Sequence, residues 1–192
     1  MKLRAILFAC VVSIASTAAH AVPIVYQTPL SGANESPPTP SAAFGNATVI
    51  YDSALHSIEV VLSFSGLSTP ASAGHIHCCT APGTNVGVAL PFAGLPSATS
   101  GTYDQVFDLT LNSSYTDAFI TASGGTTATA ESVLAAGIAS GLAYVNLHNS
   151  VFPGGEIRGF LAPAVAVPET GTAALMLVGL GVVGLYAGRR RS

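Results

Sequence analysis

The chain has 192 residues, of which 49% are hydrophobic and only 8% are charged. This composition is too apolar for a disordered chain and too poor in charge for an ordinary cytosolic domain. Five of its six basic residues lie within four residues of either end, so residues 22–163 carry eight acidic side chains and one basic side chain, Arg158. The resulting formal charge of −7 excludes a nucleic-acid-binding protein, because no basic cluster is left to contact phosphates.

Residues 1–21 contain the three parts of a secretory signal peptide. A basic start at residues 2–4 is followed by an apolar stretch at residues 5–15, and Ala19-His-Ala21 supplies the small residues that flank a cleavage bond before Val22. We therefore predict that the chain is exported. An uncleaved membrane anchor is the alternative interpretation of the same residues.

Short runs of alternating apolar and polar residues fill residues 22–163, separated by Gly, Pro, Ser and Asn. Such alternation predicts antiparallel strands with one buried face and one wet face. The pattern is clearest where Ile58, Val60 and Leu62 fall on the same face of one run. In chain order, strands are predicted at residues 24–30, 42–52, 57–65, 74–78, 86–90, 102–109, 115–120, 143–148 and 156–161.

Residues 129–139 break the alternation, because Leu134 and Ile138 recur at helical spacing before Gly141. One short helix is therefore predicted to cover an end of the sheet. About eight strands and one helix predict an all-β fold, a single antiparallel β-sandwich of Greek-key type. Residues 22–163 are about as many as one such domain needs.

Two histidines, His75 and His77, alternate on a predicted strand, so both rings lie on the same side of it, about 7 Å apart. Such a pair can chelate one metal ion if a third ligand comes from a neighbouring strand. His148 is the candidate, because it follows Tyr144 and Asn146 on one face of another predicted strand. The three histidines therefore predict either a copper or zinc site or a hydrogen-bonded cluster without metal.

Arg158 is the one basic residue among the eight acids of the middle region. Glu156 lies two residues away on the same predicted strand face, so a structural ion pair between Glu156 and Arg158 is expected. Glu35 is a second acidic residue that can reach the guanidinium from the first loop. A clamp for a substrate anion is the alternative role of Arg158.

Cys78 and Cys79 are adjacent, and they are the cysteines that remain after removal of the signal peptide. A pair of thiols rarely stays reduced in an oxidising compartment, so a disulfide between these neighbours is expected. It would be a strained one, because neighbouring Cα atoms about 3.8 Å apart lie below the usual disulfide range. Free or intermolecular thiols, or metal ligation beside His77, are the alternatives.

Motifs of the common enzymes are absent from the sequence. It has no Gly-X-Ser-X-Gly, no glycine loop for phosphates and no Cys-X-X-Cys, and it lacks tryptophan for stacking sugars. We therefore expect no enzymatic activity. A metal-dependent redox enzyme that uses the three histidines is the alternative.

Residues 170–188 contain no charged residue. At about 1.5 Å per residue, a helix of this length spans just under 30 Å, which is enough for one membrane crossing. A transmembrane helix is therefore predicted at residues 171–188. The cluster Arg189-Arg-Arg191 would keep the C-terminus in the cytoplasm and the preceding domain outside it.

The motif Val167-Pro168-Glu169, the apolar helix and the arginine cluster follow one another in residues 164–192. This order resembles the PEP-CTERM sorting signal of Gram-negative bacteria. The resemblance implies a tail that an exosortase, a membrane-embedded enzyme similar to cysteine transpeptidases, cleaves near Pro168. A plain single-span anchor is the alternative.

Three further motifs lie between the ends of the chain, at residues 30–38 (LSGANESPP), 74–77 (GHIH) and 144–159 (YVNLHNSVFPGGEIRG). Together they resemble the CHRD domain, a family named for repeats in chordin, the extracellular antagonist of bone morphogenetic proteins. The resemblance covers residues 25–161 and implies a β-sandwich fold. It implies no particular activity, because none is general to the bacterial members.

A looser resemblance, to copper-zinc superoxide dismutase, rests on the His-X-His strand and a later histidine, and it makes copper a metal to test. We expect an exported module at the cell surface or in the extracellular matrix of a Gram-negative bacterium, anchored in the inner membrane with its domain in the periplasm before processing. It would bind a polysaccharide or protein, or serve as a structural matrix component. The alternative is a copper or zinc protein with redox activity.

Overall fold

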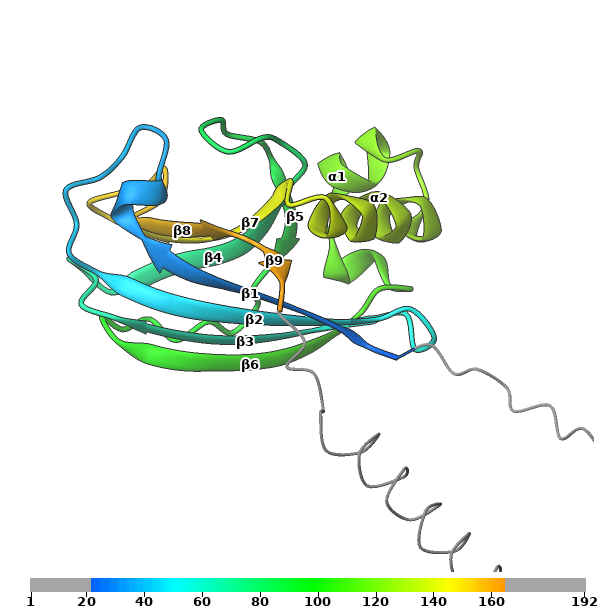
Figure 1. Ribbon diagram of the computed structural model, residues 1–192, viewed down its shortest axis with the longest axis horizontal. Helices are drawn as coiled ribbons and strands as arrows, with labels where there is room; N and C mark the ends of the chain where they lie inside the picture. The colour runs from blue at the N-terminus through cyan, green and yellow to red at the C-terminus, as the bar shows by residue number, and fades with distance from the viewer. Residues whose placement is uncertain (1–21, 165–192) are drawn as a thin grey trace, which may run out of the picture.

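The computed structural model describes residues 22–164 (Figure 1). The predicted signal peptide at residues 1–21, the sorting motif at 167–169, the transmembrane helix at 171–188 and the arginine cluster at 189–191 lie outside the described residues. Within residues 22–164, no helix combines the length and the apolar character that a membrane crossing requires.

Nine strands in the described part of the chain form one antiparallel sheet. The strand order is β5-β4-β7-β8-β1-β2-β3-β6, and the short β9 pairs with β1. The strands are β1 (Ile24–Ser31), β2 (Phe44–Asp52), β3 (Ser57–Ser65), β4 (Ala71–Cys78), β5 (Val88–Pro91), β6 (Gly101–Asp108), β7 (Ala143–Asn149), β8 (Ile157–Phe160) and β9 (Ala162–Pro163).

The sheet curls on itself, so that β4, β7 and β8 lie over β1, β2, β3 and β6 (Figure 1). The bend falls between β8 and β1, which share a single register pair, Ser31 with Arg158. The prediction of a mostly β, antiparallel fold is confirmed. The two halves belong to one continuous curled sheet, where we had expected a sandwich of separate sheets.

The core fills the space between the two halves of the sheet. In β3, Ile58, Val60 and Leu62 are at most 1% exposed, as the alternating pattern predicts. Val145 and Leu147 of β7 supply the facing layer and are fully buried. Because the core uses one face of β7, the residues that alternate with these two point to the opposite face.

The prediction of a strand at residues 115–120 is wrong, because this segment contains the helix α1 (Asp117–Ala122). The hydroxyl of Thr116 caps the helix by accepting a hydrogen bond from the Phe119 amide, at 3.2 Å. Tyr115 and Phe119 are four residues apart and stack with ring centroids 6.1 Å apart. The cap and the apolar pair at helical spacing outweigh a short alternation.

The predicted helix at residues 129–139 is present as α2 (Thr127–Ala139). It packs at one end of the sheet beside α1 (Figure 1). Its buried Glu131 accepts a hydrogen bond from the Tyr51 hydroxyl and lies 2.9 Å from Nδ1 of His56. The described chain therefore has two α-helices where one was expected, besides two 3-10 turns, η1 (Gly32–Asn34) and η2 (Asn112–Ser114).

Candidate metal site

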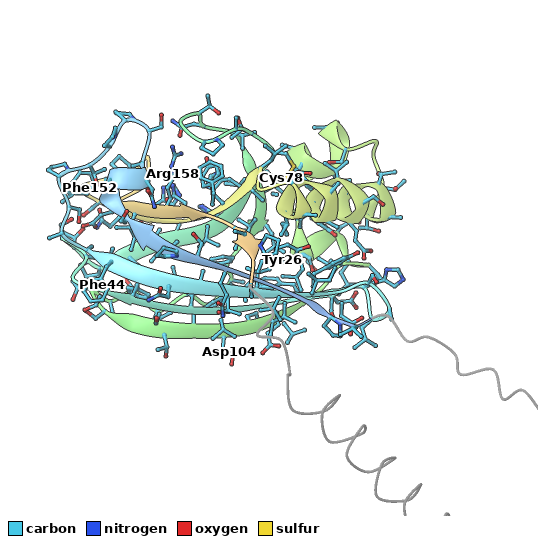
Figure 2. The ribbon with its side chains drawn as sticks, viewed as in Figure 1. Tyr26, Phe44, Cys78, Asp104, Phe152 and Arg158 are labelled. Carbon is cyan, nitrogen blue, oxygen red and sulfur yellow. A yellow bond between two sulfur atoms is a disulfide. The ribbon has the colours of Figure 1, made fainter. Side chains whose placement is uncertain are left out.

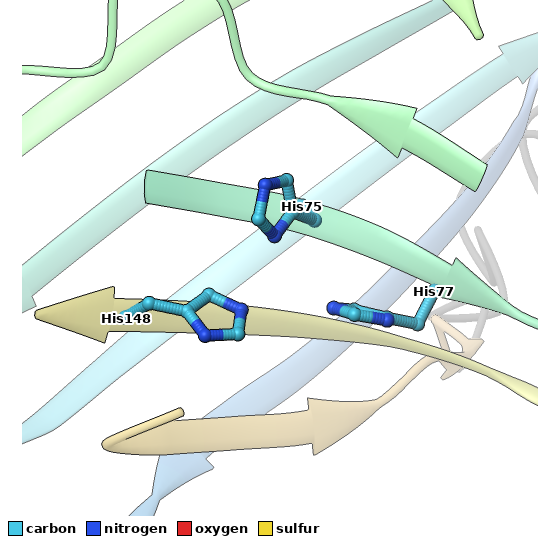
Figure 3. A group of neighbouring side chains, drawn as sticks. All are labelled: His75, His77 and His148. Carbon is cyan, nitrogen blue, oxygen red and sulfur yellow. The ribbon is translucent and has the colours of Figure 1, made fainter. Parts of the chain in front are cut away.

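The pairing of β4 with β7 brings the three predicted ligands together (Figure 3). His75 and His77 lie on the same face of β4, and His148 pairs with Ala73, one step along the same face. One ring nitrogen of each histidine lies within 4.8 Å of one ring nitrogen of the other two. The three rings therefore form a compact group on the face of the sheet that is turned away from the core.

Main-chain carbonyl groups hold two of the three rings in place. Nδ1 of His77 lies 2.8 Å from the carbonyl oxygen of Val86, and Nδ1 of His148 lies 3.0 Å from that of Pro153. Since a carbonyl only accepts hydrogen bonds, each Nδ1 must carry the proton, which leaves the lone pair on Nε2. Fixing the second nitrogen of a histidine in this way is typical of metal ligands.

Each histidine also has a buried nitrogen without a hydrogen-bond partner in the described part of the chain. These atoms are Nδ1 of His75 and Nε2 of His77 and His148. A buried polar atom without a partner costs free energy, so native proteins rarely leave one unsatisfied. Three of them in one cluster of histidines are accounted for if a metal ion is their partner.

The rings are in the protonation state that a metal needs. Burial lowers the pKa of all three histidines, and it lowers that of His75 to about 4 with help from the neighbouring His148 and His77. The three imidazoles are therefore uncharged near neutral pH. Metal binding then requires no loss of protons from them.

The donor set fits copper or zinc. Imidazole suits both metals, and bonds of about 2.0–2.1 Å place two ligand nitrogens of a tetrahedral site roughly 3.3 Å apart. Nitrogens within 4.8 Å of one another therefore need only a small inward movement to share an ion. Three protein ligands also leave one coordination position open.

An aromatic and cationic stack lies behind His77. The His77 ring is nearly parallel to that of Tyr144, with a centroid distance of 4.7 Å and an interplanar angle of 4°. Cζ of Arg158 lies over the Tyr144 ring, 4.8 Å from its centroid. This arrangement was not predicted, although the alternation in residues 143–148 does place Tyr144 on the face that carries the histidines.

The predicted ion pair between Glu156 and Arg158 is wrong. The carboxylate beside Arg158 is that of Glu35, whose Oε2 lies 3.7 Å from Nε of the arginine. The strand β8 begins at Ile157, so Glu156 lies in a bend where strict alternation does not apply. Its side chain turns to other partners and accepts hydrogen bonds from Ser41, at 2.6 Å, and from Ser68.

Arg158, which is labelled in Figure 2, also donates hydrogen bonds to two loops. Its Nε donates to the carbonyl oxygen of Asn34 at 2.5 Å. Its Nη1 donates to Oδ1 of Asn85 at 2.7 Å and to the carbonyl oxygen of Thr84 at 3.3 Å. Asn85 directly precedes Val86, whose carbonyl orients His77, so Arg158 supports the metal-facing ring through this loop.

Cys78 and Cys79 are joined by a disulfide that packs against α2 (Figure 2). Cys78 is 4% exposed and belongs to the core, and Sγ of Cys79 lies 3.7 Å from the carbonyl oxygen of Val133. A Cβ atom added at Gly137 would overlap both sulfur atoms. Gly137 thus makes room for the disulfide under the helix.

Gly137→Ala is expected to destabilise the protein by about 1–3 kcal/mol, because the new methyl group collides with the disulfide. In an ordinary helix the same change stabilises by up to about 1 kcal/mol, so the sign of the effect is the test. Gly154→Ala is the matched control, since a Cβ atom there meets nothing within 4 Å. Urea unfolding of both variants measures the difference, and a stabilised Gly137→Ala protein would contradict the packing.

The metal-free protein is expected to lose about 1–2 kcal/mol of stability as the pH falls from 6.5 to 4, after allowance for solvent screening. The pKa of His75 is about 4 in the folded chain against an ordinary value of 6.5, so the unfolded state takes up its proton first. The raised pKa of Glu35, about 7, acts in the opposite direction. Comparing wild type with His75→Asn cancels that contribution, and equal pH slopes in both would refute the expectation.

The CHRD domain family matches residues 26–161 of the chain. This range holds all three histidines, Arg158 and the strands that position them. No curated protein and no solved structure matches the chain. Since the family match covers most of the chain, the resemblance expected from the three motifs is confirmed, and the chain belongs to the CHRD domain family.

Proposed function

We propose that this CHRD domain is an exported module that binds one copper or zinc ion through His75, His77 and His148. One observation carries the proposal: the three clustered histidines each have a buried ring nitrogen without a hydrogen-bond partner among residues 22–164, and carbonyl groups fix two of the rings. A purely structural histidine cluster would use those nitrogens for hydrogen bonds within the protein.

The proposed role is binding, without catalysis. A bound ion would supply a Lewis-acidic centre with one exchangeable position. The carboxylates near β8 are engaged elsewhere, since Glu35 pairs with Arg158 and Glu156 accepts hydrogen bonds from Ser41 and Ser68. The chain's own part is therefore to orient and desolvate the ligand nitrogens.

We further propose that the chain reaches the cell surface or the extracellular matrix. The signal peptide at residues 1–21 would export it, and the tail at residues 164–192 would anchor it in the membrane until an exosortase cleaves near Pro168. The released domain would meet its partner, an extracellular polysaccharide or protein, outside the cell. Membership of the CHRD family supports an extracellular or binding module.

The metal proposal is tested on the full chain, produced with export and purified without chelators. We expect one equivalent of copper or zinc in the wild-type protein by elemental analysis, and an unchanged amount in His56→Ala, whose histidine pairs with Glu131 and is not one of the three clustered histidines. His75→Ala/His77→Ala should lose the metal and remain folded by circular dichroism. A folded wild-type protein that takes up no metal in titrations would overturn the proposal.

A further inference from the structure

The charge around the three histidines is unusual for a metal site. Among residues 22–164, the side chains that can share an ion there are histidines alone, so the ligands bring no negative charge. The ring stacked on His77 is backed by a cation, because the Arg158 guanidinium lies over Tyr144 and Tyr144 lies against His77. An ion bound at the site would therefore have a fixed positive charge behind one of its ligands.

The sheet topology fixes this arrangement. The strand β7 lies between β4 and β8, and Tyr144 pairs with His77 on β4 and with Phe160 on β8. Arg158 is two residues before Phe160 on the same face of β8. His77 and Arg158 therefore flank Tyr144 from opposite neighbours, and the guanidinium keeps its place because Asn34, Thr84 and Asn85 accept its hydrogen bonds.

The charge of Arg158 is only partly compensated. Glu35 lies 3.7 Å from Nε of the arginine, but burial raises the pKa of this carboxyl to about 7. Near neutral pH, about half of the molecules then carry a neutral Glu35 beside a full positive charge. A doubly charged ion is repelled by that charge about twice as strongly as a singly charged ion at the same place.

We propose that Arg158 is a specificity-determining residue, whose charge biases the histidine site toward the singly charged cuprous ion and against divalent zinc. The inference rests on the proposed metal-binding function and adds which ion the site prefers. Arg158 touches no metal in this arrangement. Its positive charge acts through Tyr144 and disfavours a higher charge on the ion that the three imidazoles bind.

The test compares variants in which no buried carboxylate is left unpaired. Glu35→Gln keeps Arg158 but removes its acidic partner, Glu35→Gln/Arg158→Met removes both charges, and Glu35→Gln/Arg158→Lys keeps a positive charge with altered geometry. Affinities for Cu(I) under anaerobic conditions and for Zn(II) are measured by competition with chromophoric chelators at pH 8. The quantity compared is the ratio of the Cu(I) affinity to the Zn(II) affinity.

We expect this ratio to fall about tenfold from Glu35→Gln to Glu35→Gln/Arg158→Met, and to change little in Glu35→Gln/Arg158→Lys. If both affinities fall together and the ratio stays constant, Arg158 acts only by positioning the loop above His77, and the inference is overturned. Should the methionine variant fail to fold, Glu35→Gln alone decides, because its ratio must then exceed that of wild type by several-fold. If the wild-type protein binds neither ion, the proposed function itself is overturned. This outcome needs only the wild-type measurement and is therefore distinct from the comparison of variants.

Discussion

Replacing Glu156 with alanine is expected to lower the free energy of unfolding by about 3–4 kcal/mol. Its carboxylate is fully buried and accepts hydrogen bonds from the Ser41 hydroxyl, from the backbone and hydroxyl of Ser68, and from the side-chain amide of Asn149. Every partner is a donor, which is the pattern that suits a carboxylate. Without it, four donors at this buried carboxylate lose it as an acceptor at once.

The same network explains why so large an effect is expected from one side chain. Ser41 lies in the loop before β2, Ser68 follows β3, and Asn149 ends β7, so Glu156 joins segments from both halves of the curled sheet. Thr39 adds a hydrogen bond to the backbone carbonyl of Glu156, at 2.9 Å. Glu156 therefore links the two halves of the sheet through hydrogen bonds.

Equilibrium unfolding in urea provides the measurement. Glu59→Ala is the matched control, because this carboxylate lies half-buried on the outer face of β3, and its loss should change stability by no more than about 0.5 kcal/mol. Glu156→Gln should fall between the two, since one of its amide hydrogens would face donors. A loss below about 1 kcal/mol for Glu156→Ala would mean that water replaces the carboxylate.

The sequence was sufficient to predict features that depend on period-two alternation. The strand at residues 57–65 has the predicted bounds, since Ile58, Val60, Leu62 and Phe64 alternate along it and all face the core. The meeting of His75 and His77 with His148 follows from the same rule, once β4 and β7 are neighbours. The alternation rule gave a wrong prediction at residues 115–120. There the alternation covers only six residues, and the Thr116 cap favours a helix.

The partners of Arg158 and the orientation of the histidine rings could not be predicted from side-chain patterns. Glu35 is separated from Arg158 by more than a hundred residues, and the pairing of β1 with β8 brings them together. His77 and His148 are fixed by the carbonyl groups of Val86 and Pro153, and any residue type has a carbonyl. Such contacts leave no signal in the alternation from which strands are predicted.

Arg158→Met is expected to cost about 3–5 kcal/mol at pH 8–9, because it leaves the buried Glu35 without its cation. In wild type the pKa of Glu35 is raised to about 7, and the guanidinium limits that rise. Removing the guanidinium raises this pKa further. Above pH 7 the variant must therefore either bury an unpaired carboxylate or hold a proton that wild type has released.

The sign of the pH dependence separates this cause from lost packing. Below about pH 7 Glu35 is protonated in both proteins, so the deficit of Arg158→Met relative to wild type should stay constant down to pH 5. Above pH 7 the deficit should grow, because wild type has released the Glu35 proton and loses no further stability, whereas the variant still holds that proton and continues to lose stability as the pH rises. The histidines carry no charge in this upper range and add nothing to the difference. The double variant Glu35→Gln/Arg158→Met should show no such growth with pH. Its remaining, constant deficit measures the hydrogen bonds to Asn34, Thr84 and Asn85. If the deficit of Arg158→Met does not change between pH 5 and 9, the ionisation of Glu35 does not depend on Arg158.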